Sequence, residues 1–351
     1  MMSHAFDASN HLLEQVRTAL SDGNSLCIRG GGSKTRIGRQ VIGQELDTRE
    51  HRGIVSYDPT ELVVTVRAGT TLAELEQALD EKSQWLPFEP PHLGQGATVG
   101  GMVAAGLSGP RRPWVGSVRD FVLGTRVISG HGKHLRFGGE VMKNVAGYDV
   151  SRLMAGSFGC LGVLTEISLK VLPKPRSLAN LRLRIDLPEA LQKLADWGQQ
   201  PLPISAACHD GESLHLRLEG GESSVAAARD RLGCEIVEPG FWNALKEQRL
   251  PFFDDPRPLW RLSLPIASPD LRLPGNQLVD WGGAQRWLKS DASAEEIRSI
   301  AQSARGHAIC FDGGESTFHP LSEPLMRYHR QLKAQLDPQR VFNPGRMYAE
   351  I

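Results

Sequence analysis

Several features that define common classes of protein are missing from this sequence of 351 residues. Its five cysteines stand far apart and form no C-x-x-C pair, so we expect no zinc ribbon, iron–sulfur cluster or disulfide framework. No apolar run approaches the roughly 18 residues of a membrane-spanning helix, and the first residues lack the basic and apolar regions of a signal peptide. These absences predict a cytoplasmic protein whose only route to a membrane is through a partner.

An excess of either charge is also missing, because forty basic and forty acidic residues cancel. The chain therefore has no overall field that attracts nucleic acid or an anionic membrane. Two nucleotide-binding fingerprints fail as well. Ser33 separates Gly32 from Lys34, which a P-loop does not allow, and Thr35 stands where a Rossmann fingerprint has its third glycine. ATP hydrolysis and NAD binding in their commonest forms are therefore disfavoured.

Glycine, by contrast, is abundant, and three consecutive glycines follow an apolar strand predicted at residues 26–28. A helix predicted at residues 9–20 precedes that strand. Gly30, Gly31 and Gly32 have no side chains, so their backbone N–H groups can close on a bulky anion. Arg29 and Lys34 add positive charge on either side. The loop suits a diphosphate, and the alternative is a solvated Gly-Ser turn.

Two further segments are rich in glycine and small residues, at 94–109 and 156–165. The first has an alternative interpretation as a glycine-rich helix packed tightly on another element. Interior glycines each cost about 0.5–1 kcal/mol relative to alanine, so that alternative explains several of them together poorly. The second alone is more typical of a loop that leads into a core strand. Together with the first loop, they predict an extended ligand with a diphosphate and planar ends, such as a dinucleotide.

The remaining patterns divide the chain at a proline-rich linker, residues 173–176. Before the linker we predict strands at 53–57, 62–66, 121–129 and 162–172, a hairpin turn at 129–133, and helices at 72–82 and 150–155. Thr70 or Thr71 is expected to cap the helix at 72–82. After the linker we predict strands at 181–187, 214–218, 260–264 and 308–311 and helices at 188–197, 223–232 and 322–336. This alternation indicates an antiparallel sheet with helices on one face.

The glycine segments also carry a family resemblance. Residues 29–34, residues 96–109 and the run Lys143-Asn144-Val145-Ala146-Gly147-Tyr148-Asp149, which leads into 156–165, resemble the vanillyl-alcohol-oxidase (PCMH-type) FAD-binding family. With the ending Phe342-Asn343-Pro344-Gly345-Arg346, the chain is similar to FAD-binding E subunits of bacterial glycolate oxidases. The implied fold class is α+β. A PCMH-type FAD-binding domain of two α+β subdomains (1–175) precedes a smaller α+β cap domain with an antiparallel sheet (176–351), whose C-terminal tail returns to the FAD domain.

The resemblance also implies a role for each site residue. The pyrophosphate loop comprises Arg29, Gly30, Gly31, Gly32, Ser33 and Lys34. The residues along the flavin and its ribityl chain are Thr98, Val99, Gly100, Gly101 and Ser108. Gly156, Gly162 and Val163 approach the adenine half through backbone atoms. Relatives that attach FAD covalently often have a histidine after the first glycines, whereas this chain has Ser33, so noncovalent FAD is expected.

The function implied by the resemblance is that of a subunit in a glycolate oxidase complex, which oxidises glycolate to glyoxylate and passes electrons to an acceptor other than NAD. Its implied partners are a larger homologous FAD subunit and an iron–sulfur subunit. Two alternatives remain open. One is a non-catalytic structural subunit of the same complex, and the other is a stand-alone FAD oxidoreductase of the same fold with another substrate.

The sequence assigns no catalytic residue and no metal site. Related 2-hydroxy-acid dehydrogenases carry a motif like His-x-Gly-Asp-Gly-Asn-x-His, but Cys208 stands at its first ligand position here, and its centre is lost before His215. The alternative for His215 is an exposed face of the strand at 214–218. Arg111 and Arg112 either bind a carboxylate or are solvated loop charges. Other candidates are Glu315 and His319, whose geometry nothing fixes, and Tyr148 and Asp149, for which a packed ring and a helix cap are favoured.

Overall fold

The chain divides into two units in the computed structural model, which describes residues 5–139, 149–314 and 317–351. The first unit comprises Met1–Ser108, Gly116–Pro173 and Pro320–Ile351, and the second comprises Gly109–Val115 and Lys174–His319. The boundary at residue 173 lies within the expected linker. The division differs from the expected one at Gly109–Val115, which packs with the second unit rather than the first.

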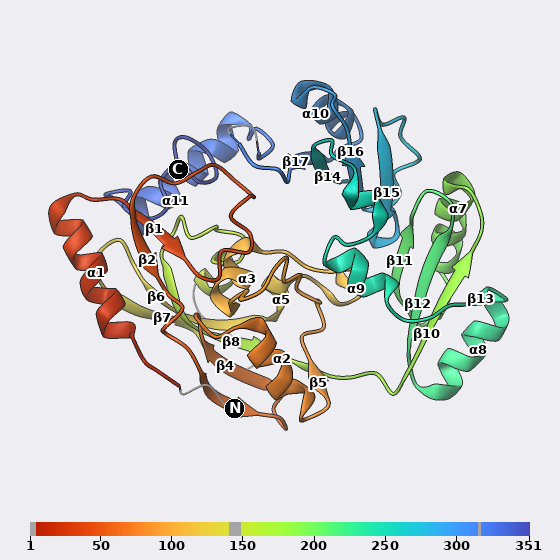
Figure 1. Ribbon diagram of the computed structural model, residues 1–351, viewed down its shortest axis with the longest axis horizontal. Helices are drawn as coiled ribbons and strands as arrows, with labels where there is room; N and C mark the ends of the chain where they lie inside the picture. The colour runs from red at the N-terminus through yellow and green to blue at the C-terminus, as the bar shows by residue number, and fades with distance from the viewer. Residues whose placement is uncertain (1–4, 140–148, 315–316) are drawn as a thin grey trace. The chain divides into compact units, whose positions relative to one another are not determined.

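A five-stranded antiparallel sheet organises the first unit, in the order β3-β4-β8-β6-β7 (Figure 1). Its strands are β3 (Ile54–Asp58), β4 (Val63–Arg67), β8 (Val163–Lys170), β6 (Val122–Ile128) and β7 (His134–Gly138). The four strands predicted here are confirmed, and the predicted turn at 129–133 joins β6 to β7. Strand β7 was not predicted, although its sequence His-Leu-Arg-Phe-Gly alternates polar and apolar residues, because that alternation covers only five residues directly after the predicted turn.

A smaller parallel pair, β1 (Leu26–Arg29) and β2 (Gln44–Asp47), forms a second layer of the same unit. Helix α1 (Ser9–Asp22) packs on it through Leu12 and Val16, which meet Leu26, Leu46 and Phe342 in one buried cluster. The helical spacing of those apolar residues, which the sequence shows, is what turns one face of α1 inward. Phe342 also forms a parallel bridge with Leu26, so the C-terminal segment extends this layer.

Helix α2 (Leu72–Asp80) is capped by Thr71 in a capping box with Glu74. The Glu74 N–H donates to Thr71 Oγ1 (3.2 Å), and the Thr71 N–H donates to Glu74 Oε2 (3.0 Å). The Thr70 hydroxyl instead accepts from the N–H of Gly53 (2.8 Å), which settles the choice between the two threonines. The other helices of this unit are α3 (Val99–Ala105), α5 (Val118–Phe121), α6 (Val150–Leu153) and α11 (Glu323–Leu336), and a short pair joins β5 (Gln84–Trp85) to β9 (Leu172–Pro173).

An eight-stranded antiparallel sheet organises the second unit, in the order β13-β10-β12-β11-β15-β16-β14-β17 (Figure 1). Its strands are β10 (Ser177–Leu183), β11 (Ile204–His209), β12 (Leu214–Gly220), β13 (Glu235–Ile236), β14 (Leu259–Ser263), β15 (Asn276–Asp280), β16 (Gln285–Lys289) and β17 (His307–Cys310). The helices are α4 (Arg112–Val115), α7 (Leu187–Trp197), α8 (Glu222–Leu232), α9 (Phe241–Lys246) and α10 (Ala294–Ser303). Strand β10 begins and ends earlier than predicted, because Asp186 caps α7 by accepting from the Glu189 N–H (2.9 Å).

The three longest helices of this unit cover one face of the sheet, as predicted. Helices α7 and α8 pack on Leu181, Ala207 and Leu216, and α10 packs on Leu262 and Leu288. The register joins the two clusters across one face, because His209 pairs with Val279, Val279 with Arg286, and Arg286 with Leu262. The opposite face carries polar and charged side chains, among them His215, Arg217, Glu219, Arg261 and His307.

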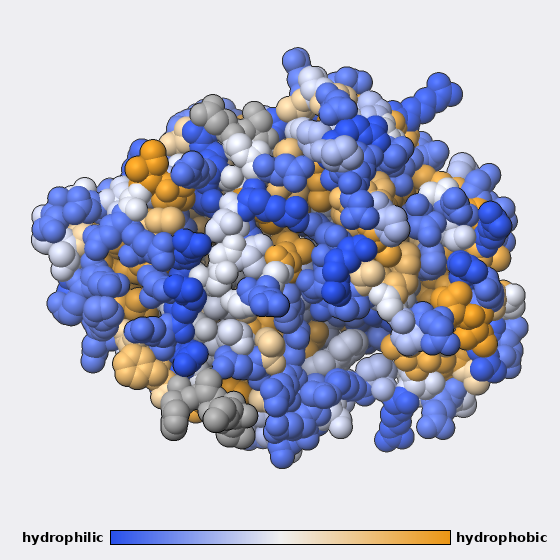
Figure 2. All heavy atoms as spheres, in the orientation of Figure 1, coloured by the Kyte–Doolittle hydropathy of each residue, from blue (hydrophilic) through white to orange (hydrophobic). Residues whose placement is uncertain are grey.

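Exposed apolar side chains are scattered over both units. In Figure 2 a group of them gathers over β10 and β13, at one edge of the larger sheet, where Leu178 and Ile236 are 48% and 61% exposed. Within the residues that the structure describes, no helix combines the length and the apolar composition needed to cross a bilayer.

Candidate functional site

The first glycine loop leaves β1 and turns tightly at Gly32, whose φ of +70° favours glycine. Its carbonyl accepts from the N–H of Thr35 (3.2 Å), which closes the turn. Within the described chain, the N–H groups of Gly31, Gly32 and Ser33 donate to no other group. Backbone donors that are left unused in a concave loop form an anion-binding nest.

Two cations flank this nest. Arg29 forms an exposed ion pair with Glu45 (3.1 Å). The Lys34 ammonium is half-buried and donates to the carbonyl of His92 (3.0 Å) and to Ser33 Oγ (3.1 Å). The neighbouring carbonyl and hydroxyl therefore hold the Lys34 charge beside the loop.

The second glycine segment packs directly against the first. A β-carbon on Gly31 would overlap the carbonyl oxygen of Gly96, and one on Gly30 would overlap Thr98 Oγ1. Thr98 also caps α3, because its Oγ1 accepts from the N–H of Gly101 (3.2 Å). Two segments that lie more than sixty residues apart thus meet at backbone distance, which only glycine permits.

Part of the second segment fits the alternative interpretation, a glycine-rich helix that packs tightly on another element. Gly100 is buried at the start of α3, where an added β-carbon would lie 2.8 Å from that of Ala68. The N–H of Val99 donates to Thr70 and that of Gly100 to Ala68, so neither donor is available to a ligand. Gly101, in contrast, is exposed. The Oγ of Ser108 accepts from the N–H of Val118 (3.1 Å).

The third segment joins the second through backbone hydrogen bonds. The N–H of Gly156 donates to the carbonyl of Val103 (3.0 Å), and that of Phe158 donates to the carbonyl of Ala104 (2.8 Å). Gly162 and Val163 are buried, and the Val163 side chain belongs to the core around α1. Val163 is 0% exposed and pairs with Ile128 within the sheet, so it has no open surface. The run Lys143–Tyr148, which contributed to the family resemblance, lies outside the described residues.

The C-terminal turn ties the first and third segments together. The family resemblance implied that the C-terminal tail returns to the FAD domain, but the sequence did not predict these contacts. Asn343 Oδ1 accepts from the N–H of Ile28 in β1 (2.8 Å), and its Nδ2 donates to the carbonyl of Phe158 (2.7 Å). The Arg346 guanidinium donates to four carbonyls of the first loop region, those of Lys34, Thr35, Ile37 and Arg39. The turn therefore holds the first and third glycine segments in one arrangement.

The arginines that were candidates for carboxylate binding lie in the second unit and differ from each other. Arg111 Nε lies 3.2 Å from Glu219 Oε2, and Arg217 Nε lies 3.1 Å from Glu219 Oε1. Because the Arg111 side chain is only 17% exposed, it is not a solvated loop charge. Arg112 is exposed, with its guanidinium 4.4 Å from the centre of the Trp281 ring.

His215 is buried rather than exposed, so the interpretation of an exposed strand face was wrong. Its Nε2 lies 2.8 Å from Asp210 Oδ2, and its ring stacks on Phe241 at 3.7 Å. Burial raises the pKa of Asp210, but the hydrogen bonds from His215, Glu212 and Ser213 outweigh it, and the net pKa lies far below the usual value. No group of three metal-ligating side chains occurs in the part of the chain that the structure describes.

The remaining candidates have structural roles where the structure describes them. Asp149 caps α6, because its Oδ1 accepts from the N–H of Arg152 (3.1 Å), as favoured above. His319 Nδ1 accepts from the N–H of Ala308 (3.4 Å), which places it beside β17. Tyr148 and Glu315 lie outside the described residues.

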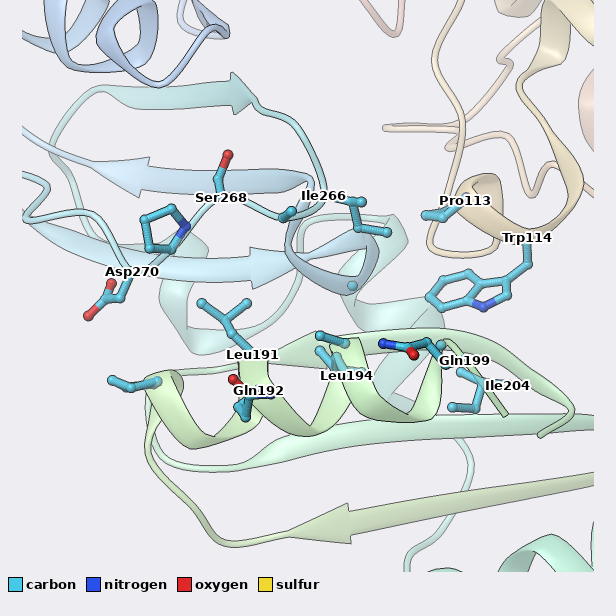
Figure 3. A pocket seen from close by; sticks show the side chains of 16 residues that line it. Pro113, Trp114, Leu191, Gln192, Leu194, Gln199, Ile204, Ile266, Ser268 and Asp270 are labelled. Atoms are coloured by element: carbon cyan, nitrogen blue, oxygen red, sulfur yellow. The ribbon is translucent and has the colours of Figure 1, made fainter. Parts of the chain in front are cut away.

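A cavity of about 730 Å³ lies in the second unit, between α7, the loop at 266–270 and the segment around Trp114. Figure 3 shows Leu191 and Leu194 of α7 pointing into it, across from Ile266. Its only charged lining residue is Asp270, so among the described residues nothing in it would attract a small anion.

Comparisons with known proteins agree with this arrangement. A family model described as an FAD binding domain matches residues 7–138. The chain is 63% identical to glycolate oxidase subunit GlcE of Escherichia coli (strain K12) over 98% of this chain and 99% of that protein. It is 32% identical to glycolate oxidase subunit GlcD of Bacillus subtilis (strain 168), over 50% of this chain and 36% of that protein. A solved alkyldihydroxyacetonephosphate synthase shares the fold, with a TM-score of 0.68, 16% identity and coverage of 98% of this chain and 75% of that one.

The glycine-loop unit with its FAD-binding match, together with the unit built on an antiparallel sheet, defines a PCMH-type flavoprotein with an α+β cap. This confirms the predicted fold class and the predicted FAD cofactor. At 63% identity over nearly its whole length, the chain belongs to the family of glycolate oxidase subunit GlcE.

Proposed function

We propose that this chain is the FAD-binding subunit of a glycolate oxidase complex, which oxidises glycolate, a 2-hydroxy acid, to glyoxylate and passes electrons to an acceptor other than NAD. One observation carries the proposal. Three glycine segments meet in one unit, beside a loop with three unused backbone N–H groups, in a chain of the GlcE family. That combination fits a dinucleotide with a diphosphate and does not fit the P-loop or Rossmann patterns.

Different residues of this chain would bind different parts of FAD. The N–H groups of Gly31, Gly32 and Ser33, with Gly30 beside them and the charges of Arg29 and Lys34, would bind the pyrophosphate. Gly101 and Ser108 would present a surface to the flavin and its ribityl chain, which the buried Thr98, Val99 and Gly100 would support. Gly156 would present its backbone to the adenine half, supported by the buried Gly162 and Val163. When bound, FAD supplies the two-electron acceptor that 2-hydroxy-acid oxidation requires.

We further infer that FAD is held noncovalently, because Ser33 stands where covalently flavinylated relatives often have a histidine. Denaturing the purified yellow protein with acid and separating the precipitate tests this inference. The flavin is expected in the supernatant, and flavin that remains with the precipitate would contradict it. A colourless protein that takes up no added FAD would contradict the cofactor assignment itself.

The proposed partners would supply the electron-transfer groups for which the described part of this chain has no ligand cluster. Its widely spaced cysteines and the absence of a metal-ligating group among the described residues leave no place for an iron–sulfur relay. A larger homologous FAD subunit and an iron–sulfur subunit would supply the rest of the path, and a cytoplasmic complex of this kind would reach the membrane only through them. The isolated chain should bind FAD but turn over glycolate poorly, and brisk turnover by the chain alone would contradict this dependence.

One observation favours a second function. Related dehydrogenases place a metal ligand at the position of His215, but here His215 forms a hydrogen bond with Asp210 and stacks on Phe241. In this alternative the chain stabilises the complex, and the larger subunit performs the chemistry. Reconstituting the complex with Gly31→Val and Gly32→Val separates the two possibilities. Loss of activity together with FAD from this subunit supports a redox role, and full activity supports the structural one.

A further inference from the structure

Arg261 lies on the polar face of the larger sheet, at the centre of β14. Its neighbours Trp260 and Leu262 pack against α10, so strand alternation turns Arg261 to the opposite face. In the antiparallel pair of β14 with β17, Arg261 is opposite Ile309, and Ser263 is opposite His307. Arg261 and His307 are therefore diagonal neighbours on one face, with Cβ atoms about 7 Å apart. A long arginine side chain reaches across that spacing.

Arg261 has no partner for its charge within the described chain. It makes no ion pair and no hydrogen bond there, and its Nε is fully enclosed. Its guanidinium carbon lies 5.1 Å from the centre of the Phe311 ring. The His307 side chain likewise makes no hydrogen bond with described residues and lies 6.3 Å from the His319 ring. A sheltered guanidinium without an anion is the kind of group that a ligand completes.

The charge that shifts the pKa of Arg261 is positive. Burial and the charge of Arg112 lower the pKa of Arg261 to about 10, which still leaves it protonated at neutral pH. Burial, Arg261 and His319 lower the pKa of His307 in turn. Two buried carboxylates of the same face already have partners. Glu219 lies between Arg111 and Arg217, and Asp280 accepts from the Trp281 N–H (2.6 Å) and from Gln285 Nε2 (3.1 Å).

Aromatic rings limit what can enter. Trp287 is opposite Arg261 in the neighbouring strand β16, and it packs edge-on against Phe311 (5.0 Å) and Phe253 (5.8 Å). Flat apolar rings beside a guanidinium favour a small planar anion over a bulky one, and a guanidinium presents paired N–H groups that match the two oxygens of a carboxylate. The apolar cavity beside α7 offers no such cation.

We propose that Arg261, with His307 beside it, binds the carboxylate of a small organic acid. The geometry calls for a small anion, and the choice of a 2-hydroxy acid such as glycolate as that anion rests on the proposed function. Arg261 binds the carboxylate through its guanidinium, and His307 adds a hydrogen bond from the adjacent strand. The residues that would hold FAD all lie in the other unit, so a defect at Arg261 leaves them unchanged.

The test is calorimetric titration of the FAD-loaded full chain with sodium glycolate, with glycolamide as the uncharged analogue and sodium phosphate as a second anion. The variants are Arg261→Gln, Arg261→Lys and, as a matched control, Arg182→Gln. Arg182 lies on the same face at the far side of the sheet, where Glu235 neutralises it at 2.8 Å. FAD content, read from the visible spectrum, is measured for every variant.

Glycolate should bind to the wild type and to Arg182→Gln alike, and glycolamide should bind to neither. Arg261→Gln should weaken glycolate binding about tenfold or more, with Arg261→Lys in between, because one charge-assisted pair is lost. Phosphate binding that equals glycolate binding would mean a general anion site and would overturn the carboxylate assignment. Equal glycolate affinity in wild type and Arg261→Gln, or no glycolate binding by the FAD-loaded wild type, would overturn the proposal. Neither result would affect the FAD content, so the proposed function is judged separately by turnover of the reconstituted complex.

Discussion

Gly31 is the residue at which one added methyl group should cost the most. Its β-carbon would overlap the carbonyl oxygen of Gly96, a backbone atom that cannot rotate away. Gly31→Ala should force the first and second loops apart and weaken FAD binding about tenfold or more, as overpacking commonly costs 1–3 kcal/mol. FAD titration by fluorescence quenching measures this. Gly221→Ala is the control, since Gly221 has a φ of −74° and no atom near its missing side chain. Equal FAD affinity in both variants would contradict the close approach.

His51 should make stability depend on pH. It is fully buried, and its Nδ1 accepts from the N–H of Ala8 (3.0 Å). Burial lowers its pKa, outweighing the opposite effect of Asp7. The unfolded state therefore binds a proton more readily, so stability is complete above about pH 6.5 and declines as the pH falls below it, by at most about 1.4 kcal/mol per pH unit. Urea unfolding at several pH values should show a steeper acid decline for the wild type than for His51→Gln, and parallel curves would refute this.

The C-terminal turn is the element whose loss should loosen the FAD loop. Arg346 donates to four carbonyls between Lys34 and Arg39, and Arg346→Met removes that donor from all four, although the Lys34 carbonyl still accepts from the N–H of Ile37. We expect a loss of about 2–4 kcal/mol in stability and weaker FAD binding. Thermal unfolding and FAD titration report the two effects. Arg327→Gln on α11 is the matched control, since that arginine is exposed and stacks on Tyr328. Equal stability and equal FAD affinity in the two variants would show that the C-terminal turn does not hold the FAD loop in place.

Elements with strong local signals were predictable, and those defined by distant contacts were not. Helix α2 shows its capping box and apolar spacing in sequence, and strand β8 shows its apolar run. Strand β16 contains Gln285, Arg286 and Lys289, which are all buried. A buried strand with so many polar residues shows no apolar pattern from which it could be predicted. Taken together, the glycine segments predicted a dinucleotide ligand. The glycine at position 100, however, is required by its close packing against Ala68 rather than by a ligand. The roles of Arg346 and Asn343 depend on partners about three hundred residues away, which no local pattern encodes.

At the scale of the whole molecule, the residues expected to hold FAD lie in one unit and Arg261 lies in the other. A ligand stabilises the part of a protein that it binds in the native state, by about 2.7 kcal/mol at a hundred times its Kd. Differential scanning calorimetry should therefore show two transitions, of which FAD at a hundred times its Kd raises one by about 5–11 °C. Gly31→Ala should reduce that shift. A single transition that moves as a whole would show that the two units unfold together.

Glycolate is expected to stabilise the other of the two units, and so to shift the other thermal transition. Because Arg261 and His307 belong to the second unit, a carboxylate bound there should raise the transition that FAD leaves in place, and Arg261→Gln should abolish that rise while the FAD-dependent shift persists. At ten times its Kd the expected stabilisation is about 1.4 kcal/mol, enough for a shift of about 3–6 °C. If glycolate raises the FAD-dependent transition instead, the carboxylate binds to the first unit. Arg261 would then be a buried charge with no ligand, and the carboxylate would have to be held by residues of the FAD-binding unit.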